Sequence, residues 1–195
     1  MVRRLTVGDA EVLREVRLAG LADAPEAFWR SWEEENARPA EDWVERARVG
    51  ASGGADVTFL AERDGVVVGS VSAHTPSAAP GLRELAAMWV APAARGSGAA
   101  DRLIGAVVDW ARAAGSVGVR LWVVPSNGRA RRVYARNGFV LVGGPEPVTD
   151  DPPAKVYVPM LRELGRELGG VSGADGGVVR ELAATPWSSP TSGST

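Results

Sequence analysis

The chain has 195 residues, of which 45% are hydrophobic and 24% charged, with a formal net charge of −2. These values are typical of one compact domain with a real core, and the charge gives no indication of a nucleic-acid partner. The absence of cysteine and the single histidine, His74, exclude disulfides, thiolate nucleophiles and multi-histidine metal sites, so no metal is expected. No apolar run approaches the roughly 18 to 20 residues of a membrane span, and the start does not resemble a signal peptide. We therefore expect a cytoplasmic protein.

The first quarter of the chain is predicted to be a short strand followed by helices. Residues 2–6 favour a strand, and Asp9 lies three residues after Thr6, which is typical of a capped helix start. Residues 24–35 are predicted to continue as a second helical stretch, rich in Trp and Glu. A third short helix is expected after Pro39.

Beyond residue 56 the pattern changes to strands that alternate with helices. Two β-rich runs, 57–62 and 66–73, are separated by Arg63-Asp64-Gly65 and predict a hairpin. A strand over 84–91 is followed by a glycine-rich turn and a long amphipathic helix. The remaining predicted elements are strand 119–124, helix 126–136, and strands 139–142 and 155–161.

This order of elements predicts an α/β (α+β) fold with a mixed, mostly antiparallel central sheet flanked by helices. We expect a single domain over residues 1–168. Residues 169–195 are rich in Gly, Ser, Thr and Pro, which predicts a flexible C-terminal tail.

The most informative segment joins the strand that ends near Val90 to the long helix. Small residues at 96–100 precede the helix, whose first backbone N–H groups lack partners and carry the positive end of the helix dipole. A phosphate could approach those groups closely. The alternative is a tight strand-to-helix connection without a ligand. A Walker-type loop and a dinucleotide fingerprint both fit poorly, because Asp101-Arg102 stands at the helix start.

Within this segment, Arg95-x-x-Gly98-x-Ala100, preceded by Val90-x-Pro92, resembles the CoA-binding signature of the GNAT superfamily of N-acetyltransferases. The signature of that family reads Arg/Gln-x-x-Gly-x-Gly/Ala.

A second segment supports the resemblance. Asn127-x-x-Ala130-x-x-x-Tyr134-x-x-x-Gly138-Phe139 follows a buried strand and is similar to the other landmark of the family. The two segments are separated by one helix and one strand, as in the family.

The resemblance covers roughly residues 2–161 and implies a sheet splayed open at the CoA site. It implies direct transfer of an acetyl group from acetyl-CoA to a primary amine of a small molecule or of a protein or peptide. The pantetheine arm would pair with the backbone at Met88, Trp89 and Val90, where amides polarise the thioester carbonyl. The partners are then acetyl-CoA and an amine acceptor, with no nucleic acid and no membrane, and homodimers are common in the family.

The resemblance also implies which residues hold the cofactor. Arg95 would close over the pyrophosphate, or it is a solvated surface cation. Asn127 would cap its helix and contact the pantetheine chain. Arg129 would reach the 3′-phosphate of CoA, or it belongs to a solvated helix face. The pyrophosphate turn itself comprises Arg95, Gly96, Ser97, Gly98, Ala99 and Ala100.

Two catalytic residues follow from the same resemblance. Tyr134 would act as the general acid toward the departing CoA sulfur, and the alternative is a tyrosine that packs on the sheet. Glu84 would act as the general base, on the face that it shares with Ala86, Met88 and Val90 by alternation along the strand. The alternative is a strand-edge carboxylate, paired with Arg83.

Three further points stay open from the sequence. Glu33, Glu34 and Glu35 could attract a cationic amine, but a run of three cannot face one site, so a solvated face is expected for at least two of them. His74 follows a β run and is expected to be structural. The rival function is a non-catalytic acyl-CoA-binding sensor or regulatory domain.

Overall fold

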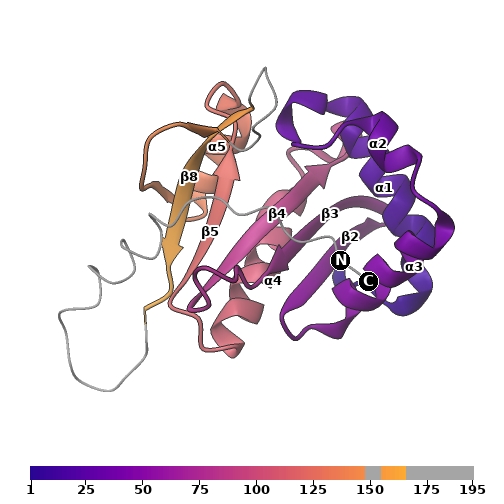
Figure 1. Ribbon diagram of the computed structural model, residues 1–195, viewed down its shortest axis with the longest axis horizontal. Helices are drawn as coiled ribbons and strands as arrows, with labels where there is room; N and C mark the ends of the chain where they lie inside the picture. Colours follow the sequence, from indigo (N-terminus) through magenta and orange to yellow (C-terminus); the bar gives the residue numbers. More distant parts are fainter. Residues whose placement is uncertain (148–154, 166–195) are drawn as a thin grey trace. The chain divides into compact units, whose positions relative to one another are not determined.

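The computed structural model describes residues 1–147 and 155–165 (Figure 1). The chain divides into two compact units, residues 1–73 with 85–110, and residues 74–84 with the described residues from 111 onward. The predicted tail lies outside the described residues, so its flexibility and the domain boundary at 168 stay predictions.

The predicted fold class is confirmed. Within the described residues, eight strands form one mixed sheet in the order β1-β2-β3-β4-β5-β8-β6, and β7 pairs with β8. Strand β4 contributes its first three residues to the second unit and the rest to the first. The elements that begin in the first unit are β1 (Val2–Arg4), α1 (Ala10–Asp23), α2 (Trp32–Asn36), α3 (Ala40–Ser52), β2 (Asp56–Arg63), β3 (Val66–His74) and α4 (Ala99–Ala113). Those that begin in the second are β4 (Leu82–Val90), β5 (Gly118–Val123), α5 (Gly128–Arg136), β6 (Val140–Leu141), β7 (Glu146–Pro147) and β8 (Val156–Glu163).

The predicted cap before α1 is confirmed. Asp9 Oδ2 accepts hydrogen bonds from the backbone amide and the hydroxyl of Thr6, each 2.7 Å long. Arg3 also donates to both oxygens of Asp9, at 2.7 and 2.9 Å. This hydrogen bond from Arg3 holds the pKa of the Asp9 carboxyl well below its usual range.

The prediction of one helical stretch over 24–35 is wrong. Pro25 starts a single 3-10 turn, after which Phe28 is extended with φ −118° and ψ 147°. Helix α2 begins only after Ser31, whose hydroxyl accepts the Glu34 amide at 3.1 Å. Glu34 Oε2 accepts the Ser31 amide at 2.6 Å in return. This reciprocal capping box ends the extended segment and starts a new helix.

Helix α3 packs closely on β2. Its buried residues are Trp43, Ala47 and Gly50, at the spacing of one helix face. A Cβ at Gly50 would lie 2.7 Å from Thr58 Oγ1, which is too close for any side chain. The hairpin that follows is as predicted, because Asp64 and Gly65 have φ values of 54° and 76°. Two consecutive positive φ values are typical of a type I′ turn.

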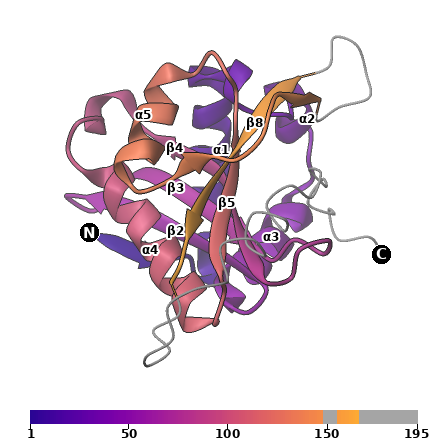
Figure 2. The ribbon, with the colours of Figure 1, turned by 90° about the vertical axis from the view of Figure 1, so that its left-hand side faces the viewer.

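Within the first unit, α3 and α4 lie on opposite faces of β2 and β3, as Figures 1 and 2 show together. Along α4, four residues of the predicted apolar face, Leu103, Val107, Trp110 and Ala111, are buried, whereas the fifth, Ala114, is exposed and follows the end of the helix. No helix among residues 1–147 and 155–165 is long and apolar enough to cross a membrane.

In the second unit, β5 runs antiparallel to β8, from Gly118 opposite Glu163 to Val123 opposite Val158 (Figure 2). Strand β6 is shorter than the predicted strand over 139–142, because only two of its residues pair with β8. The short strand β7 was not predicted.

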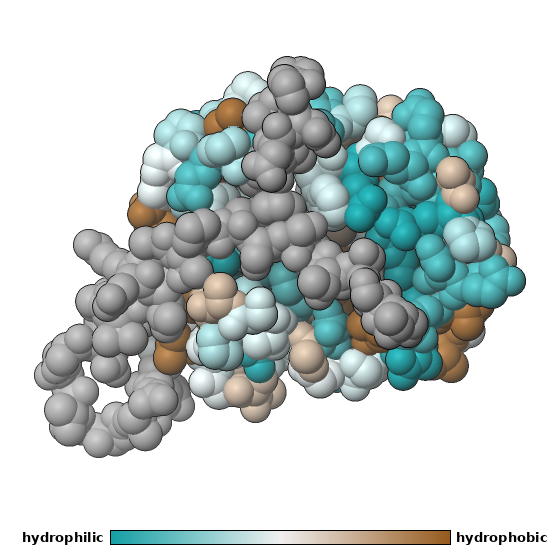
Figure 3. Space-filling view, in the orientation of Figure 1, coloured by the Kyte–Doolittle hydropathy of each residue, from teal (hydrophilic) through white to brown (hydrophobic). Residues whose placement is uncertain are grey.

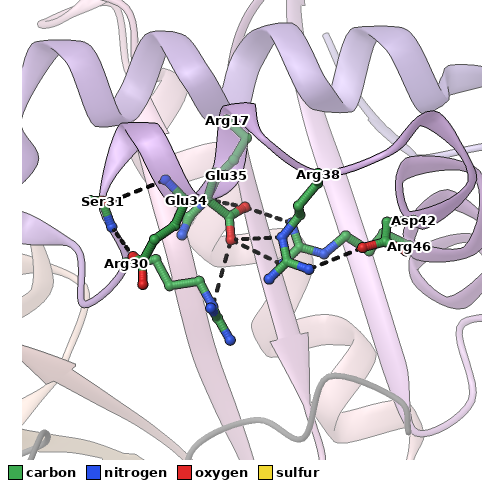
Figure 4. A network of polar contacts seen from close by, with 8 residues as sticks. All are labelled: Arg17, Arg30, Ser31, Glu34, Glu35, Arg38, Asp42 and Arg46. Atoms are coloured by element: carbon green, nitrogen blue, oxygen red, sulfur yellow. Dashed lines mark hydrogen bonds and ion pairs between the residues drawn. The ribbon is translucent and has the colours of Figure 1, made fainter. Parts of the chain in front are cut away.

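A fully buried carboxylate joins α1, α2 and α3 (Figure 4). Glu35 has no solvent exposure and pairs with four arginines that come from these helices and their connections. The nitrogen–oxygen distances are 3.4 Å to Arg17, 3.6 Å to Arg30, 3.2 Å to Arg38 and 2.6 Å to Arg46. We call these five residues the Glu35 cluster. Of the three predicted glutamates, Glu33 and Glu34 are exposed, as expected for a solvated face, and only Glu35 is internal.

Burial alone would raise the pKa of the Glu35 carboxyl, but the arginines, with Arg46 foremost, outweigh it and lower the pKa. A carboxylate with a lowered pKa stabilises the fold above its unfolded value of about 4.5. This stabilisation is lost as the pH falls through the lowered pKa.

We therefore expect Glu35→Gln to lower the free energy of unfolding at pH 7 by about 3 kcal/mol, since it leaves partly buried arginines without a counter-charge. The difference from the wild type should shrink below about pH 4, where the wild type also loses the charge. Thermal denaturation at both pH values measures this, with the exposed Glu33→Gln as the control. Equal stability of both variants at pH 7 would contradict the role of the cluster.

Candidate active site

The turn before α4 presents free backbone donors within the first unit. Gly96 and Gly98 have φ values of 81° and 78°, a conformation that side chains rarely adopt. Within the part of the chain that the structure describes, the amides of Gly96, Gly98, Ala99 and Ala100 make no hydrogen bond. Helix α4 begins at Ala99, so its dipole adds to these donors. The geometry suits an oxyanion held by backbone groups.

The Arg95 side chain is engaged inside the same unit. Its Nε donates to the Val90 carbonyl at 2.9 Å, and its guanidinium pairs with Asp23 Oδ2. Trp89 Nε1 donates to the same carboxylate oxygen at 2.9 Å. Arg95 is therefore not a solvated surface cation, and its contact with the pyrophosphate stays a prediction. The sequence analysis did not identify Asp23, which lies 72 residues from Arg95.

Two glycines allow other elements to approach the end of β4. A Cβ at Gly20 on α1 would lie 3.1 Å from Trp89 Cγ, and one at Gly69 on β3 would lie 2.7 Å from the Trp89 carbonyl oxygen. Gly20 and Asp23 are three residues apart, so both contact Trp89 from neighbouring positions on α1. The end of α1 thus holds the end of β4 by packing and by a hydrogen bond.

The expected alternation along β4 does not hold. Ala87 has a φ of 50°, which a non-glycine residue seldom adopts and which interrupts an extended strand. Glu84 and Leu85 are both buried, at successive positions. The prediction that Glu84, Ala86, Met88 and Val90 share one face is therefore wrong. The positive φ of Ala87, next to Met88, is a backbone conformation of the kind that clusters at functional sites.

Glu84 forms a buried ion pair within the second unit. Its side chain is 4% exposed, and that of Arg120 is fully buried. Oε2 accepts from Arg120 Nε and Nη2 at 3.0 and 2.8 Å, and from Trp122 Nε1 at 3.2 Å. Oε1 lies 3.8 Å from His74 Nε2. The expected pairing with Arg83 is not found, since Arg83 Nη1 donates to the Leu82 carbonyl at 3.0 Å.

Tyr134 and Asn127 lie on α5 and at its start. The Tyr134 side chain is buried, with its ring edge-on to Phe139 at a centroid distance of 5.9 Å. Burial raises the pKa of the Tyr134 phenol, so it is neutral at physiological pH. Asn127 Oδ1 accepts the Ala130 amide at 3.0 Å, which confirms the predicted cap. Its Nδ2 has no acceptor among the residues that the structure describes.

The arginines of α5 show no built anion site. Arg129 and Arg132 are exposed, and Arg131 Nη1 donates to the Pro125 carbonyl at 3.2 Å. The contact of Arg129 with a 3′-phosphate stays a prediction.

We expect Glu84→Gln to lower the free energy of unfolding by about 3–5 kcal/mol, because the buried Arg120 cation then loses the carboxylate to which it donates two hydrogen bonds. Adding Arg120→Met removes that cation, so the double variant should regain most of the loss. Chemical denaturation of both variants measures this. A stable single variant would show that Arg120 does not need the carboxylate.

Comparisons with known proteins agree with the fold. A family model described as the acetyltransferase (GNAT) family matches residues 19–139, more than half of the chain. The yncA protein of Salmonella typhimurium, solved with its cofactor acetyl-CoA, has a TM-score of 0.69 and 19% identity, over 89% of this chain and 98% of that one. The PaiA N-acetyltransferase of Thermoplasma acidophilum, in complex with coenzyme A, has a TM-score of 0.64 and 17% identity, over 84% and 98%.

A ribosomal-protein-alanine N-acetyltransferase from Brucella melitensis has a TM-score of 0.62 and 24% identity, over 84% of this chain and 99% of that one. No curated protein matches the sequence. The extent of the family match, over a fold that these structures share, shows that the chain belongs to the GNAT family of acetyltransferases.

Proposed function

We propose that the chain transfers an acetyl group from acetyl-CoA directly to a primary amine. The observation that carries this proposal is the set of free backbone amides at the start of α4, inside the segment that resembles the CoA-binding signature of the family. The acceptor is a small molecule or a protein or peptide. The names of similar structures include a spermidine N-acetyltransferase and a ribosomal-protein-alanine N-acetyltransferase, which act on these two kinds of acceptor.

In this proposal the pyrophosphate of CoA rests chiefly on the free amides of Gly96, Gly98, Ala99 and Ala100. Arg95 contributes indirectly, because it holds the turn to Asp23 and to the Val90 carbonyl. The backbone at Met88, Trp89 and Val90 would pair with pantetheine and polarise the thioester carbonyl. The free amide nitrogen of Asn127 would donate to a pantetheine carbonyl.

The reaction needs two proton transfers. The amine nitrogen attacks the thioester carbon, the carbon–sulfur bond breaks, and the ammonium proton must leave. Tyr134 would give its phenolic proton to the departing sulfur, for which a neutral phenol is the required form. Glu84 would accept the amine proton, directly or through water, and only Oε1 is available for this because Oε2 already has three donors. The Glu84→Gln, Arg120→Met double variant tests the base after the buried cation of Arg120 has also been removed.

A cytoplasmic location belongs to the same proposal, as do a homodimer and the absence of a metal or a nucleic acid from the reaction. The sequence is the basis for the location and for the two absences, and the family resemblance is the basis for the homodimer.

We expect Ala100→Glu to weaken acetyl-CoA binding at least about tenfold, because the new carboxylate lies where the pyrophosphate would rest. The fold should survive, since a negative charge in the first turn of a helix is favourable by about 0.3–1 kcal/mol. Calorimetry with acetyl-CoA measures the affinity. Ala113→Glu, the same change at the other end of α4, is the control. Unchanged affinity in the folded Ala100→Glu protein would refute the proposed site.

We expect Tyr134→Phe to lower kcat about 10²–10⁴-fold and to leave acetyl-CoA affinity nearly unchanged, because the phenol acts as charge develops on sulfur. Tyr157→Phe replaces the other tyrosine of the chain and should keep the wild-type kcat. Turnover of an amine panel by the wild type comes first, since a non-catalytic CoA sensor would bind acetyl-CoA and acetylate none of the amines. A Tyr134→Phe enzyme with wild-type kcat, where chemistry limits the rate, would make Tyr134 a packing residue.

A further inference from the structure

Two arginines of the Glu35 cluster have donors that the cluster does not use. In Arg17 and Arg30 the nitrogen nearest to Glu35 is Nε, at 3.4 and 3.6 Å. Within residues 1–147 and 155–165, their terminal nitrogens have no hydrogen-bond acceptor. Arg30 Nε is itself buried without a hydrogen bond. In Figure 4 the end of the Arg30 side chain points away from Glu35. A dashed line joins its Nε to Glu35, but none joins its terminal nitrogens to another residue.

The neighbouring carboxylates accept hydrogen bonds from other groups. Glu35 accepts hydrogen bonds from Arg46 at 2.6 Å and from Arg38 at 3.2 Å. Glu34 accepts the Ser31 amide at 2.6 Å, and Asp42 accepts Arg38 Nη1 at 3.2 Å. Four guanidiniums therefore face three carboxylates in this network (Figure 4), and none of the three takes the outer donors of the remaining two arginines.

These donors belong to side chains whose positions are fixed. The Arg17 and Arg30 side chains are only 13% and 23% exposed. The Arg17 guanidinium carbon lies 4.7 Å from the Phe28 ring centroid, and that of Arg30 lies 4.2 Å from the Trp29 ring centroid. Stacking on an aromatic ring leaves the guanidinium edge free for an oxyanion. Burial also lowers the pKa of Arg17, because its charge is poorly solvated, and a bound anion would relieve this cost.

The position of Arg17 on α1 links the cluster to the end of β4. Arg17 and Gly20 are one turn apart, about 4.5 Å along the helix axis. Gly20 is the residue that meets Trp89, next to the backbone proposed to hold the thioester. The surface over α1 to α3 is largely hydrophilic in Figure 3, which suits a polar acceptor.

We infer that Arg17 and Arg30 bind an acid group of the acceptor, so that the acetylated amine also carries a carboxylate or a phosphonate. This inference rests on the proposed function and names its substrate class. Arginine binds a carboxylate and a phosphonate in the same way, through paired N–H groups that donate to two oxygens. Both anions therefore fit this site. A cationic polyamine would be repelled by the same arginines.

The test compares amines that differ only in the acid group. Phenylalanine, its phosphonate analogue, phenylalaninamide and phenethylamine form one series, and a second series is built on leucine. We expect the wild type to favour an acid-bearing member over its neutral counterparts by at least about tenfold in kcat/KM. Arg30→Gln should reduce this preference about tenfold and leave kcat/KM for the neutral amines within about twofold. The carboxylate and phosphonate arms show which anion is preferred.

Arg48→Gln is the matched control, because Arg48 is an exposed arginine on α3 that pairs with Glu45 at 2.6 Å and does not touch Glu35. It should keep the wild-type preference. Turnover of the neutral amines with no preference for an acid would overturn the inference and leave the proposed function standing. Arg30→Gln with an unchanged preference would also overturn it.

Calorimetry with the same amines adds a readout that does not depend on turnover. Acid-dependent binding that Arg30→Gln removes and Arg48→Gln keeps would support the anion site even if no amine were acetylated, and the transferase proposal alone would then fail. If no acid-bearing amine binds better than its neutral counterpart, the inference is overturned.

Discussion

A carboxylate that has lost all contact with water must be surrounded by donors, and this requirement constrains the three N-terminal helices. Glu35 takes guanidiniums from α1, from α3 and from the segments around α2, so a shift of any one of them would leave a buried charge less well paired. Such a loss costs several kcal/mol, which is a large part of the stability of a small protein. The cluster therefore fixes α1, and with it Gly20 and Asp23, which contact the end of β4.

In the proposed CoA site, the backbone amides of the turn before α4 recognise the anion. Gly96 and Gly98 provide the positive φ values that aim the amides, and the helix dipole supplies part of the charge. The one cation of the signature, Arg95, is instead neutralised by Asp23. A substitution of Arg95 would thus detach the turn from α1 before it removed any charge from the pyrophosphate. This arrangement keeps the donors in place without relying on a long, flexible side chain.

The sequence could predict most elements and both landmark segments, because these depend on local patterns. It also contained a signal for the buried pair, since Arg120 interrupts an apolar strand and a buried cation needs a carboxylate. Its partner, Glu84, could not be identified, because the two are 36 residues apart and meet only once β4 and β5 are neighbours in the sheet. The positive φ of Ala87 left no signal, since alanine does not favour it. The sequence did contain a signal for the break within 24–35, because Ser31 and Glu34 form a capping box that indicates the start of a new helix.

Arginines have two different roles in this protein, and their hydrogen-bond acceptors distinguish the two. Arg95 has a carboxylate and a carbonyl as acceptors, so its contacts account for its position. Arg120 is likewise held by Glu84, with no solvent contact at all. Arg17 and Arg30 differ, because each is partly buried on an aromatic ring and, among the described residues, its terminal nitrogens have no hydrogen-bond acceptor. Burial of a cation is unfavourable unless it is paired, so donors left over in a fixed and partly buried guanidinium favour an external anion. An acceptor that brings this anion would supply its own counter-charge as it binds, and the arginines would then select the acceptor by its acid group.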